Sequence, residues 1–369
     1  MVGSGPAPAP AINYKKKGRR REGKRRRNRR RRRNKKEKKE SVDMTVILNN
    51  VKGYGSKKDS IAHDILEKEK QEVCLINETL LRGKRKINVP NYFSFIKSRE
   101  EGKKGGKGEG GIATLVASYL QQNTVKVGEG REGDEYMIVR FDHVQPSLNI
   151  VNIYGENEKR AGETKIVESW LRLKHDLDEI KKKGELTLIL GDMNRAVGTG
   201  EWGVSGNKEA VSPGGELIRE QLLKTGEFVL INNLELCRGG PFTWVQANKE
   251  DIKSCLDLGL ASSNLIPFIK CMVIDSKREF TARRVIKRKN DNITTIYTDH
   301  YAVKVEIVRL PRSQERIQKE TSWNLEKPGG WELYEKLSAE EAPKVKAVVE
   351  EAKLHKTNVD VVMKKVDRI

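Results

Sequence analysis

The chain has 369 residues, of which 73 are Lys or Arg and 52 are Asp or Glu, giving a formal net charge of +21. Residues 15–40 hold 19 of the basic residues and three acids, so this segment has a net charge of +16 and the other 343 residues only +5. The distribution of charge therefore excludes a uniformly basic fold. Four Cys without a CxxC pair exclude a disulfide scaffold. No apolar run approaches the roughly 20 residues of a membrane helix.

Residues 1–43 are expected to form a disordered arm. Residues 1–14 are rich in Ala and Pro, and residues 15–40 are almost entirely Arg and Lys, which repel one another and bury no apolar surface. The arm contains no apolar stretch of the secretory kind, which favours an intracellular protein. It is typical of nucleic-acid binding or a nuclear address, and the alternative is low-complexity sequence ahead of a domain that starts near Met44. We expect a nuclear protein whose partner is DNA, with RNA as a second ligand of residues 15–40.

From Met44 onward, apolar runs of strand length alternate with helical patterns. Strands are predicted at 45–51, 73–79, 112–118, 136–142, 148–155, 187–194, 228–233, 242–245, 254–262 and 301–307, and helices at 60–71, 164–182 and 213–226. A Gly/Lys-rich loop at 100–111 should be mobile and exposed. Because several neighbouring strands have no helix between them, we expect an α/β fold with mixed sheets at 44–309, followed by a partly helical connector at 310–369.

Six segments share one feature, which is that acids, amides or His follow or interrupt an apolar strand. Each is weak alone, because an Asp after a strand is ordinary turn chemistry and a lone His is usually structural. Their joint occurrence indicates a site, since α/β folds gather functional residues at strand ends. The segments are LNNVKG (48–53), INET (76–79), IYGEN (153–157), GDMNR (191–195), SCLD (254–257) and TDHYAV (298–303).

This set resembles the motifs of the endonuclease/exonuclease/phosphatase superfamily, which includes pancreatic DNase, abasic-site endonucleases, inositol-polyphosphate phosphatases and deadenylases. The resemblance covers roughly residues 44–309. It implies a four-layer α/β sandwich, in which two mixed β-sheets pack face to face with helices outside, and a metal-dependent phosphodiester hydrolase. The residues that carry it are Asn50, Asn77-Glu78-Thr79, Tyr154, Gly191-Asp192-Met193-Asn194, Ser254-Cys255-Leu256-Asp257 and Thr298-Asp299-His300.

The resemblance also implies a metal site. Phosphodiester cleavage needs a hard cation on the phosphate oxygens, and Mg²⁺ prefers one or two carboxylates and other oxygen ligands. Asn50 and Glu78 are ligands of that kind, and Asp299 is a further carboxylate. We expect these residues to bind Mg²⁺, with Mn²⁺ as the alternative. The preceding Asn49 leaves the register of the first ligand open.

The remaining roles are also implied by the resemblance. Asp192 would orient or deprotonate the attacking water, and His300 would donate to a non-bridging oxygen as charge develops there. The division of work between these two residues stays open. The other expected catalytic residues are Asn194 on a phosphate oxygen, Asp257 as the partner that sets the tautomer of His300, and Tyr154 near the leaving group. The expected substrate-binding residues are Arg195, Thr243, Ser254 and Thr298.

Within the superfamily, the chain is similar to the endonuclease of LINE-type non-LTR retrotransposons. The short form of the domain, the stretch SWNLEKPGGWELYEKL (322–337) and the basic arm carry this similarity. It implies DNA nicking that leaves a 3′-hydroxyl to prime reverse transcription. No YxDD motif is present, so we expect the reverse transcriptase domain to be missing from this chain, as in a fragment or a degenerate copy.

Two other functions are weighed against this one, a phosphoinositide phosphatase or deadenylase of the same superfamily and a non-catalytic, basic nucleic-acid-binding remnant. One segment also stays open. The basic stretch REFTARRVIKRKNDN (278–292) is either a DNA-contacting loop or a solvated loop.

Overall fold

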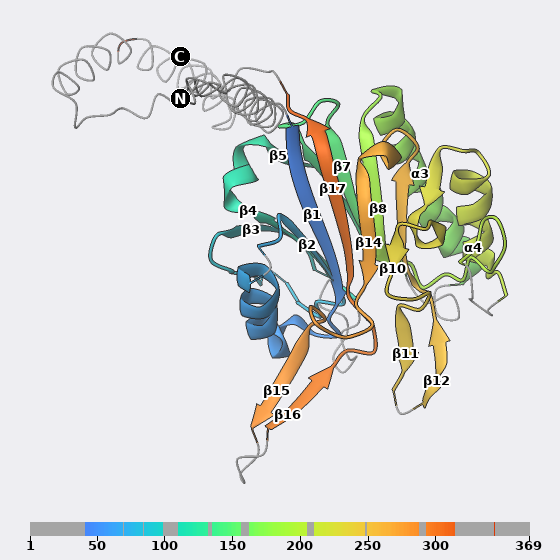
Figure 1. Ribbon diagram of the computed structural model, residues 1–369. Helices are drawn as coiled ribbons and strands as arrows, with labels where there is room; N and C mark the ends of the chain where they lie inside the picture. Colours follow the sequence, from blue (N-terminus) through green and yellow to red (C-terminus); the bar gives the residue numbers. More distant parts are fainter. Residues whose placement is uncertain are drawn as a thin grey trace, which may run out of the picture. The chain divides into compact units, whose positions relative to one another are not determined.

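Two mixed β-sheets form the core of the part of the chain that the structure describes (Figure 1). The computed structural model describes residues 41–313 except 69, 84, 99–109, 132–134, 156–161, 205–209, 248 and 288–292, together with Pro343. The predicted arm up to residue 40, most of the Gly/Lys-rich loop and the connector after residue 313 lie outside the described residues. Among the described helices, none is both long and apolar enough to cross a bilayer.

The first sheet has seven strands in the order β10-β14-β17-β1-β2-β4-β3. Their bounds are β1 (Ser41–Asn50), β2 (Val73–Asn77), β3 (Tyr92–Lys97), β4 (Ile112–Ala117), β10 (Cys237–Arg238), β14 (Ile269–Ile274) and β17 (Val303–Pro311). Strand β1 pairs parallel with β2 and antiparallel with β17. The ends of β1 and β2 and the start of β17 therefore lie at one end of the sheet.

The second sheet has six strands in the order β5-β6-β7-β8-β13-β9. Their bounds are β5 (Thr124–Glu129), β6 (Glu135–Phe141), β7 (Leu148–Tyr154), β8 (Leu186–Asp192), β9 (Phe228–Leu230) and β13 (Asp257–Ser262). The strands predicted at 136–142 and 148–155 are confirmed as β6 and β7, which pair antiparallel. Strands β7 and β8 are parallel and β13 is antiparallel to β8, so Tyr154, Asp192 and Asp257 lie at one end of this sheet.

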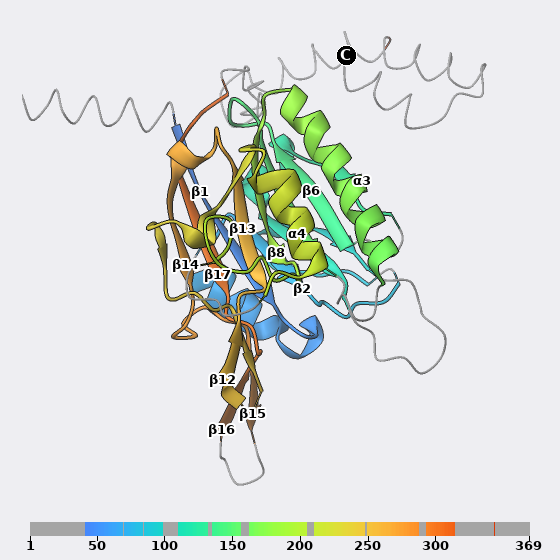
Figure 2. The same cartoon turned by 90° about the vertical axis from the view of Figure 1, so that its right-hand side faces the viewer.

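Helices cover the outer faces of both sheets. Their bounds are η1 (Tyr54–Ser56), η2 (Ser60–Glu67), η3 (Ser118–Asn123), α3 (Glu163–Lys182), α4 (Pro213–Ile218), η4 (Arg219–Leu223), η5 (Ile231–Asn233) and η6 (Ile266–Phe268). The helix predicted at 164–182 is confirmed as α3, whose Trp170, Leu173 and Leu177 pack on the outer face of the second sheet (Figure 2). On the other side, Ile61 and Ile65 of η2 pack against the first sheet.

The largest buried cluster lies between the two sheets. Strand β1 shows how the sequence builds this arrangement, because successive side chains of a strand point to opposite faces. Val46 and Leu48 belong to the cluster between the sheets, whereas Ile47 belongs to the cluster under η2. A strand buried on both faces reads as a continuous apolar run, as β1 does. The four layers confirm the predicted sandwich of two mixed sheets with helices outside.

Two hairpins extend from the end of the sandwich where β1 and β8 finish (Figures 1 and 2). One is formed by β11 (Trp244–Gln246) and β12 (Lys249–Ser254), and the other by β15 (Arg283–Lys287) and β16 (Ile293–Tyr297). The strand predicted at 254–262 is confirmed for Asp257–Ser262 as β13, but Ser254 belongs to β12, and the chain crosses into the second sheet between them. The stretch at 278–292, predicted as a loop, contains β15.

Candidate active site

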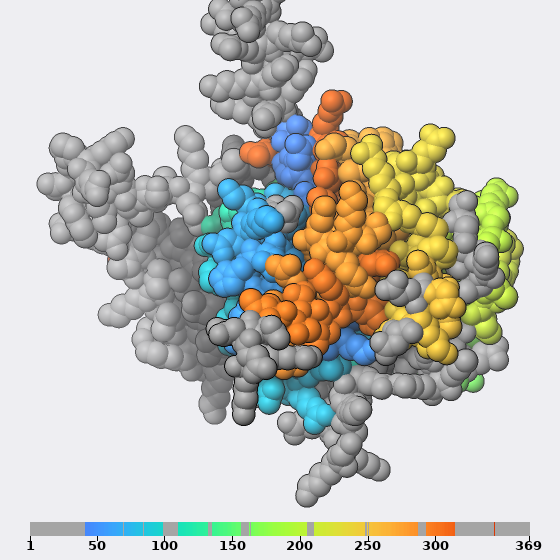
Figure 3. Space-filling view, turned by 60° about the horizontal axis from the view of Figure 1, so that its bottom comes forward, coloured from blue at the N-terminus to red at the C-terminus, as the bar shows by residue number. Residues whose placement is uncertain are grey.

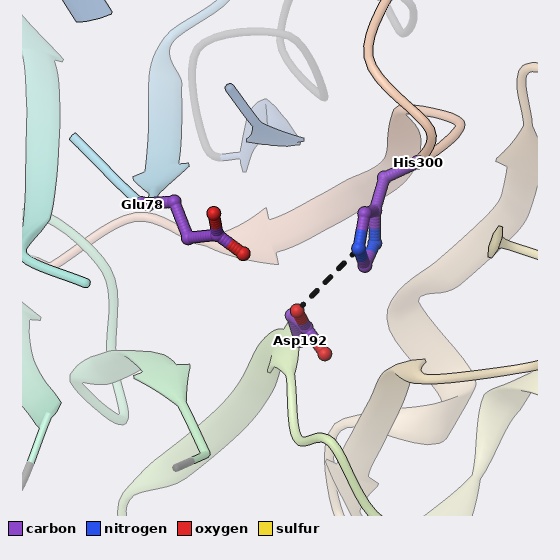
Figure 4. Close-up of side chains that lie close together, drawn as sticks. All are labelled: Glu78, Asp192 and His300. Atoms are coloured by element: carbon purple, nitrogen blue, oxygen red, sulfur yellow. Dashed lines mark ion pairs between the residues drawn. The ribbon is translucent and has the colours of Figure 1, made fainter. Parts of the chain in front are cut away.

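Three side chains that can bind a metal converge where the two sheets meet. Glu78 directly follows β2, Asp192 is the last residue of β8, and His300 precedes β17. One carboxylate or imidazole atom of each lies within 4.8 Å of the others (Figure 4). Glu78 has a left-handed backbone, with φ of 51°, which is uncommon for a residue with a side chain. Such strained positions concentrate at functional sites.

Asn50, the last residue of β1, completes this cluster. Its Nδ2 donates to Glu78 Oε1 at 3.1 Å and to Asp192 Oδ2 at 2.9 Å. Its Oδ1 is buried and has no hydrogen-bond partner among the described residues. A half-turn of the amide would direct this oxygen at the two carboxylates. Two carboxylates and one amide oxygen form a set that suits Mg²⁺, so the residues present fit the predicted cation.

The neighbouring Asn49 points away from the cluster, because adjacent residues of a strand face opposite sides. Its Oδ1 accepts a hydrogen bond from Ala282 N at 2.8 Å. The open register is therefore decided, with Asn50 in the site and Asn49 outside it.

His300 is held between two carboxylates. Its Nδ1 lies 2.8 Å from Asp257 Oδ2, and its Nε2 lies 3.7 Å from Asp192 Oδ2. Burial alone lowers the pKa of His300, but Asp257 and Asp192 outweigh it and raise that pKa to about 10. The contact with Asp257 turns Nδ1 away from the cluster, so Nε2 is the atom that faces it. The Asp257 carboxylate also keeps a proton on Nδ1.

Asp257 is positioned by buried polar groups on both sides. Thr243 Oγ1 accepts from Asp257 N at 2.9 Å and from Leu256 N at 3.0 Å, and the Thr243 side chain is fully buried. Asn232 Nδ2 donates to Asp257 O at 3.1 Å. Thr243 thus acts on the site through Asp257. Its predicted contact with substrate stays a prediction.

Asp192 is almost completely buried, and burial raises its pKa although His300 opposes the shift. Asn194, with a left-handed φ of 48°, donates its backbone N–H to Asp192 Oδ1 at 3.0 Å. Its side-chain amide donates to Gly155 O at 2.7 Å. This turn keeps the Asp192 carboxylate directed at the cluster.

Tyr154 ends β7 and reaches the same cluster. Its hydroxyl donates to Glu78 Oε1 at 3.2 Å. Burial, followed by the charges of Glu78 and Asp192, raises the pKa of Tyr154. The phenol therefore stays protonated and acts as a hydrogen-bond donor.

Asp299 lies at the edge of the site, outside the cluster formed by Glu78, Asp192 and His300. Its carboxylate pairs with Lys52 Nζ at 3.0 Å. Burial raises the pKa of Asp299, but His300 and Lys52 outweigh it and lower that pKa. Its role as a metal ligand stays a prediction.

The other predicted substrate-binding residues are mostly buried. Thr298 donates to His300 O at 2.8 Å, and Arg195 donates to Asn194 O at 3.0 Å, so both support residues of the site. Ser254 is buried at the end of β12, where its carbonyl accepts from Thr243 N.

Several residues near the site were not assigned a role from the sequence. Asn77 bridges the sheets, since its Nδ2 donates to Asn152 Oδ1 at 2.8 Å and its Oδ1 accepts from Asp192 N at 3.1 Å. The signal available in the sequence was an amide inside an apolar strand, as at Asn152. Lys52 and Lys57 also lie near the site. The only signal for them in the sequence was their position in a basic loop.

No protein-family model and no curated protein matches this chain. Solved structures do match it. The 3′-5′ exonuclease NExo from Neisseria meningitidis is 15% identical with a TM-score of 0.52, covering 72% of this chain and 99% of that one. A structure of NExo described as a 3′ phosphatase bound to product DNA hairpin is 15% identical with a TM-score of 0.50, covering 72% and 99%. The catalytic domain of APE2 from Xenopus laevis is 16% identical with a TM-score of 0.52, covering 74% and 94%. The predicted resemblance is confirmed in the fold, which is the DNase-like α/β sandwich.

Proposed function

We propose that this protein is a Mg²⁺-dependent phosphodiester hydrolase that nicks DNA and leaves a 3′-hydroxyl. The observation that carries the proposal is the convergence of Asn50, Glu78, Asp192 and His300, contributed by both sheets, with Asp257 behind His300. A purely structural cluster of buried carboxylates would raise the free energy of the fold, because each buried charge needs compensation. A functional site explains why these carboxylates are buried here despite this unfavourable free energy.

Asn50 and Glu78 would hold the cation, which would neutralise charge on the phosphate and activate the leaving oxygen. Asp192 is placed to accept the proton of a water, because Asn194 and Asn50 orient its two oxygens. His300 Nε2 faces the same space and would donate to a non-bridging oxygen. Asp257 keeps the Nδ1 proton in place and thereby directs Nε2.

DNA is the substrate that the surroundings favour. Lys52 is exposed beside the cluster, and residues 15–40 add a net charge of +16. Both features suit a polyanion longer than a single phosphate group. The NExo structure bound to a DNA hairpin has the same fold, which supports this choice. A phosphoinositide phosphatase or deadenylase remains the second candidate, favoured by the shared fold.

We further propose that the protein acts in the life cycle of a retrotransposon. The similarity of residues 322–337 to a retrotransposon connector and the basic arm support it. In this role the 3′-hydroxyl of the nick would prime reverse transcription, the arm would also bind RNA, and the protein would act in the nucleus.

The test is relaxation of supercoiled plasmid by the full chain with Mg²⁺, Mn²⁺ or EDTA. We expect relaxation with Mg²⁺ that is lost in His300→Ala and in Asp192→Ala, while both variants still bind DNA. His175→Ala on α3 is the control, because this His is largely exposed and far along the helix from the cluster. Normal nicking by both site variants would refute the assignment. A folded wild-type protein that binds but never nicks would favour the non-catalytic remnant.

A further inference from the structure

The β15–β16 hairpin is fixed at its base beside the site. The bond from Ala282 N to Asn49 Oδ1 places the start of β15 next to the residue that precedes Asn50. At the other side of the base, Arg278 donates to Thr298 O at 2.6 Å and stacks on Tyr297, 5.1 Å from the ring centre. The hairpin therefore has a defined direction relative to the cluster.

Asp275 holds the turn that leads into this hairpin. Its carboxylate accepts from Phe280 N at 2.7 Å and from the Thr281 hydroxyl at 2.8 Å. Thr281 Oγ1 in turn accepts from Ala302 N at 3.0 Å. These buried bonds connect the start of β15 to the segment that contains His300.

Beyond its base, the hairpin exposes apolar side chains. Val285, Ile293 and Ile296 are 58%, 69% and 47% exposed, three of the eight large hydrophobic residues exposed in the described part of the chain. An uncovered two-stranded ribbon is marginally stable in water. By the alternation of side chains along a strand, Val285 and Ile293 lie on one face of the ribbon and Ile296 on the other, so apolar groups are exposed on both faces, as on a ribbon that a partner surrounds.

The hairpin also carries positive charge. Residues 278–297 contain six basic residues and two acids. Arg283 is neutralised by Asp64 at 3.0 Å, whereas Arg284 has no ion pair among the described residues. Arg284 lies opposite Ile296 in the ladder, so a cation and an apolar group share one face of the ribbon.

The positive charge is continuous with the site. Lys57 is mostly buried, and its pKa is lowered first by burial and further by the charges of Arg284 and Lys52, while Asp299 and Glu78 oppose the shift. Arg284, Lys52, Asp299 and Glu78 therefore all lie close enough to Lys57 for their charges to shift its pKa. Figure 3 shows the orange hairpin surface on the same face of the molecule as the yellow-orange surface of β11–β12.

We propose that the β15–β16 ribbon enters a groove of duplex DNA next to the cleaved phosphate, with Arg284 on a backbone phosphate and Ile296 against base edges. This inference rests on the proposed function. The major groove of B-DNA, about 12 Å wide, admits a two-stranded β-ribbon, and apolar side chains contact the thymine methyl group there. The basic composition of the ribbon favours DNA over a protein partner.

The test compares duplex nicking with hydrolysis of bis(4-nitrophenyl) phosphate, a diester too small to reach the ribbon, in the full chain. In Arg284→Glu, the ratio of the two rates should fall roughly tenfold, and the slope of log rate against log salt should decrease by about one unit. Lys183→Glu makes the same charge change after the last turn of α3, at the opposite end of the sandwich, and should leave the ratio at the wild-type value.

Ile296→Thr tests groove insertion, because Thr keeps the branched side chain of a strand residue and removes the apolar end. We expect the positions of nicks along a sequenced linear duplex to shift. An unchanged ratio in Arg284→Glu overturns the inference, and so do unchanged nick positions in Ile296→Thr. Wild-type protein that hydrolyses the small diester but nicks no DNA refutes the proposed substrate instead, and wild-type protein that does neither refutes the proposed chemistry.

Discussion

His143 makes the stability of the fold depend on pH in a way that can be measured apart from the site. It lies in the turn between β6 and β7, where both ring nitrogens are buried without a hydrogen-bond partner in the described residues. Burial, followed by the charge of Arg312, lowers the pKa of His143 from 6.5 to about 4, although Asp142 opposes the shift. The fold therefore disfavours the imidazolium form.

The sign and size of the effect follow from proton linkage. Between pH 6.5 and about 4 the unfolded chain binds a proton at His143 that the folded chain does not, so stability falls as pH falls through this window. The difference in pKa corresponds to about 3 kcal/mol. Because the ring is partly exposed, we expect a loss of about 2 kcal/mol between pH 7 and pH 4.

The assay is urea unfolding of the wild type and of His143→Gln at several pH values. Carboxylates also change protonation in this range, but they do so in both proteins, so the difference between the two isolates His143. The wild type should lose stability relative to the variant below pH 6.5. His63→Gln, which replaces an exposed His, serves as the control. A difference between wild type and His143→Gln that is constant from pH 7 to pH 4 would refute the reasoning.

Two further predictions concern the site and the sheet beneath it. Asn50→Ala should raise the Mg²⁺ concentration needed for half-maximal nicking by roughly tenfold to a hundredfold, because it removes a ligand oxygen. A Mg²⁺ titration of plasmid nicking measures this concentration. An unchanged midpoint of the titration would contradict the assignment of Asn50 as a ligand. Gly191→Ala should lower the free energy of unfolding by about 3 kcal/mol, since its Cβ would lie 1.8 Å from Ile153 O and force β7 away from β8. Urea unfolding tests the second prediction against Gly55→Ala, whose Cβ meets no atom within 4 Å, and equal stability of the two variants would contradict it.

Elements with a strong local pattern were predicted well from the sequence. The helix at 164–182 and the strands that became β1, β2, β7 and β8 were each visible, because spacing or a buried apolar run is a local property. Strands β3, β5 and β14 were among those that were not predicted. Strand β5 illustrates the reason, since Val125 and Val127 are exposed at a sheet edge and its pattern does not resemble a buried strand.

The identity of the polar residues at the strand ends was determined by the sequence alone. The segments that contain Glu78, Asp192 and His300 stand out because each follows or precedes an apolar run, and the resemblance to the superfamily then points to these residues within them. That these three residues lie close together could be expected, since strand ends share an edge of a sheet. The distances between their side chains could not be predicted from the sequence.

The tertiary structure decided which neighbours serve these residues. Asn50 rather than Asn49 faces the cluster because pairing of β1 with β2 and β17 sets which side each residue occupies. Thr243 reaches Asp257 because β11 and β12 pair as a hairpin, and β15 begins beside Asn49 because Ala282 packs on the outer face of the first sheet together with Ile47. The contact between Ala282 and Asn49 joins residues 233 positions apart, and such long-range register depends on how the distant strands of the first sheet pair rather than on any local pattern.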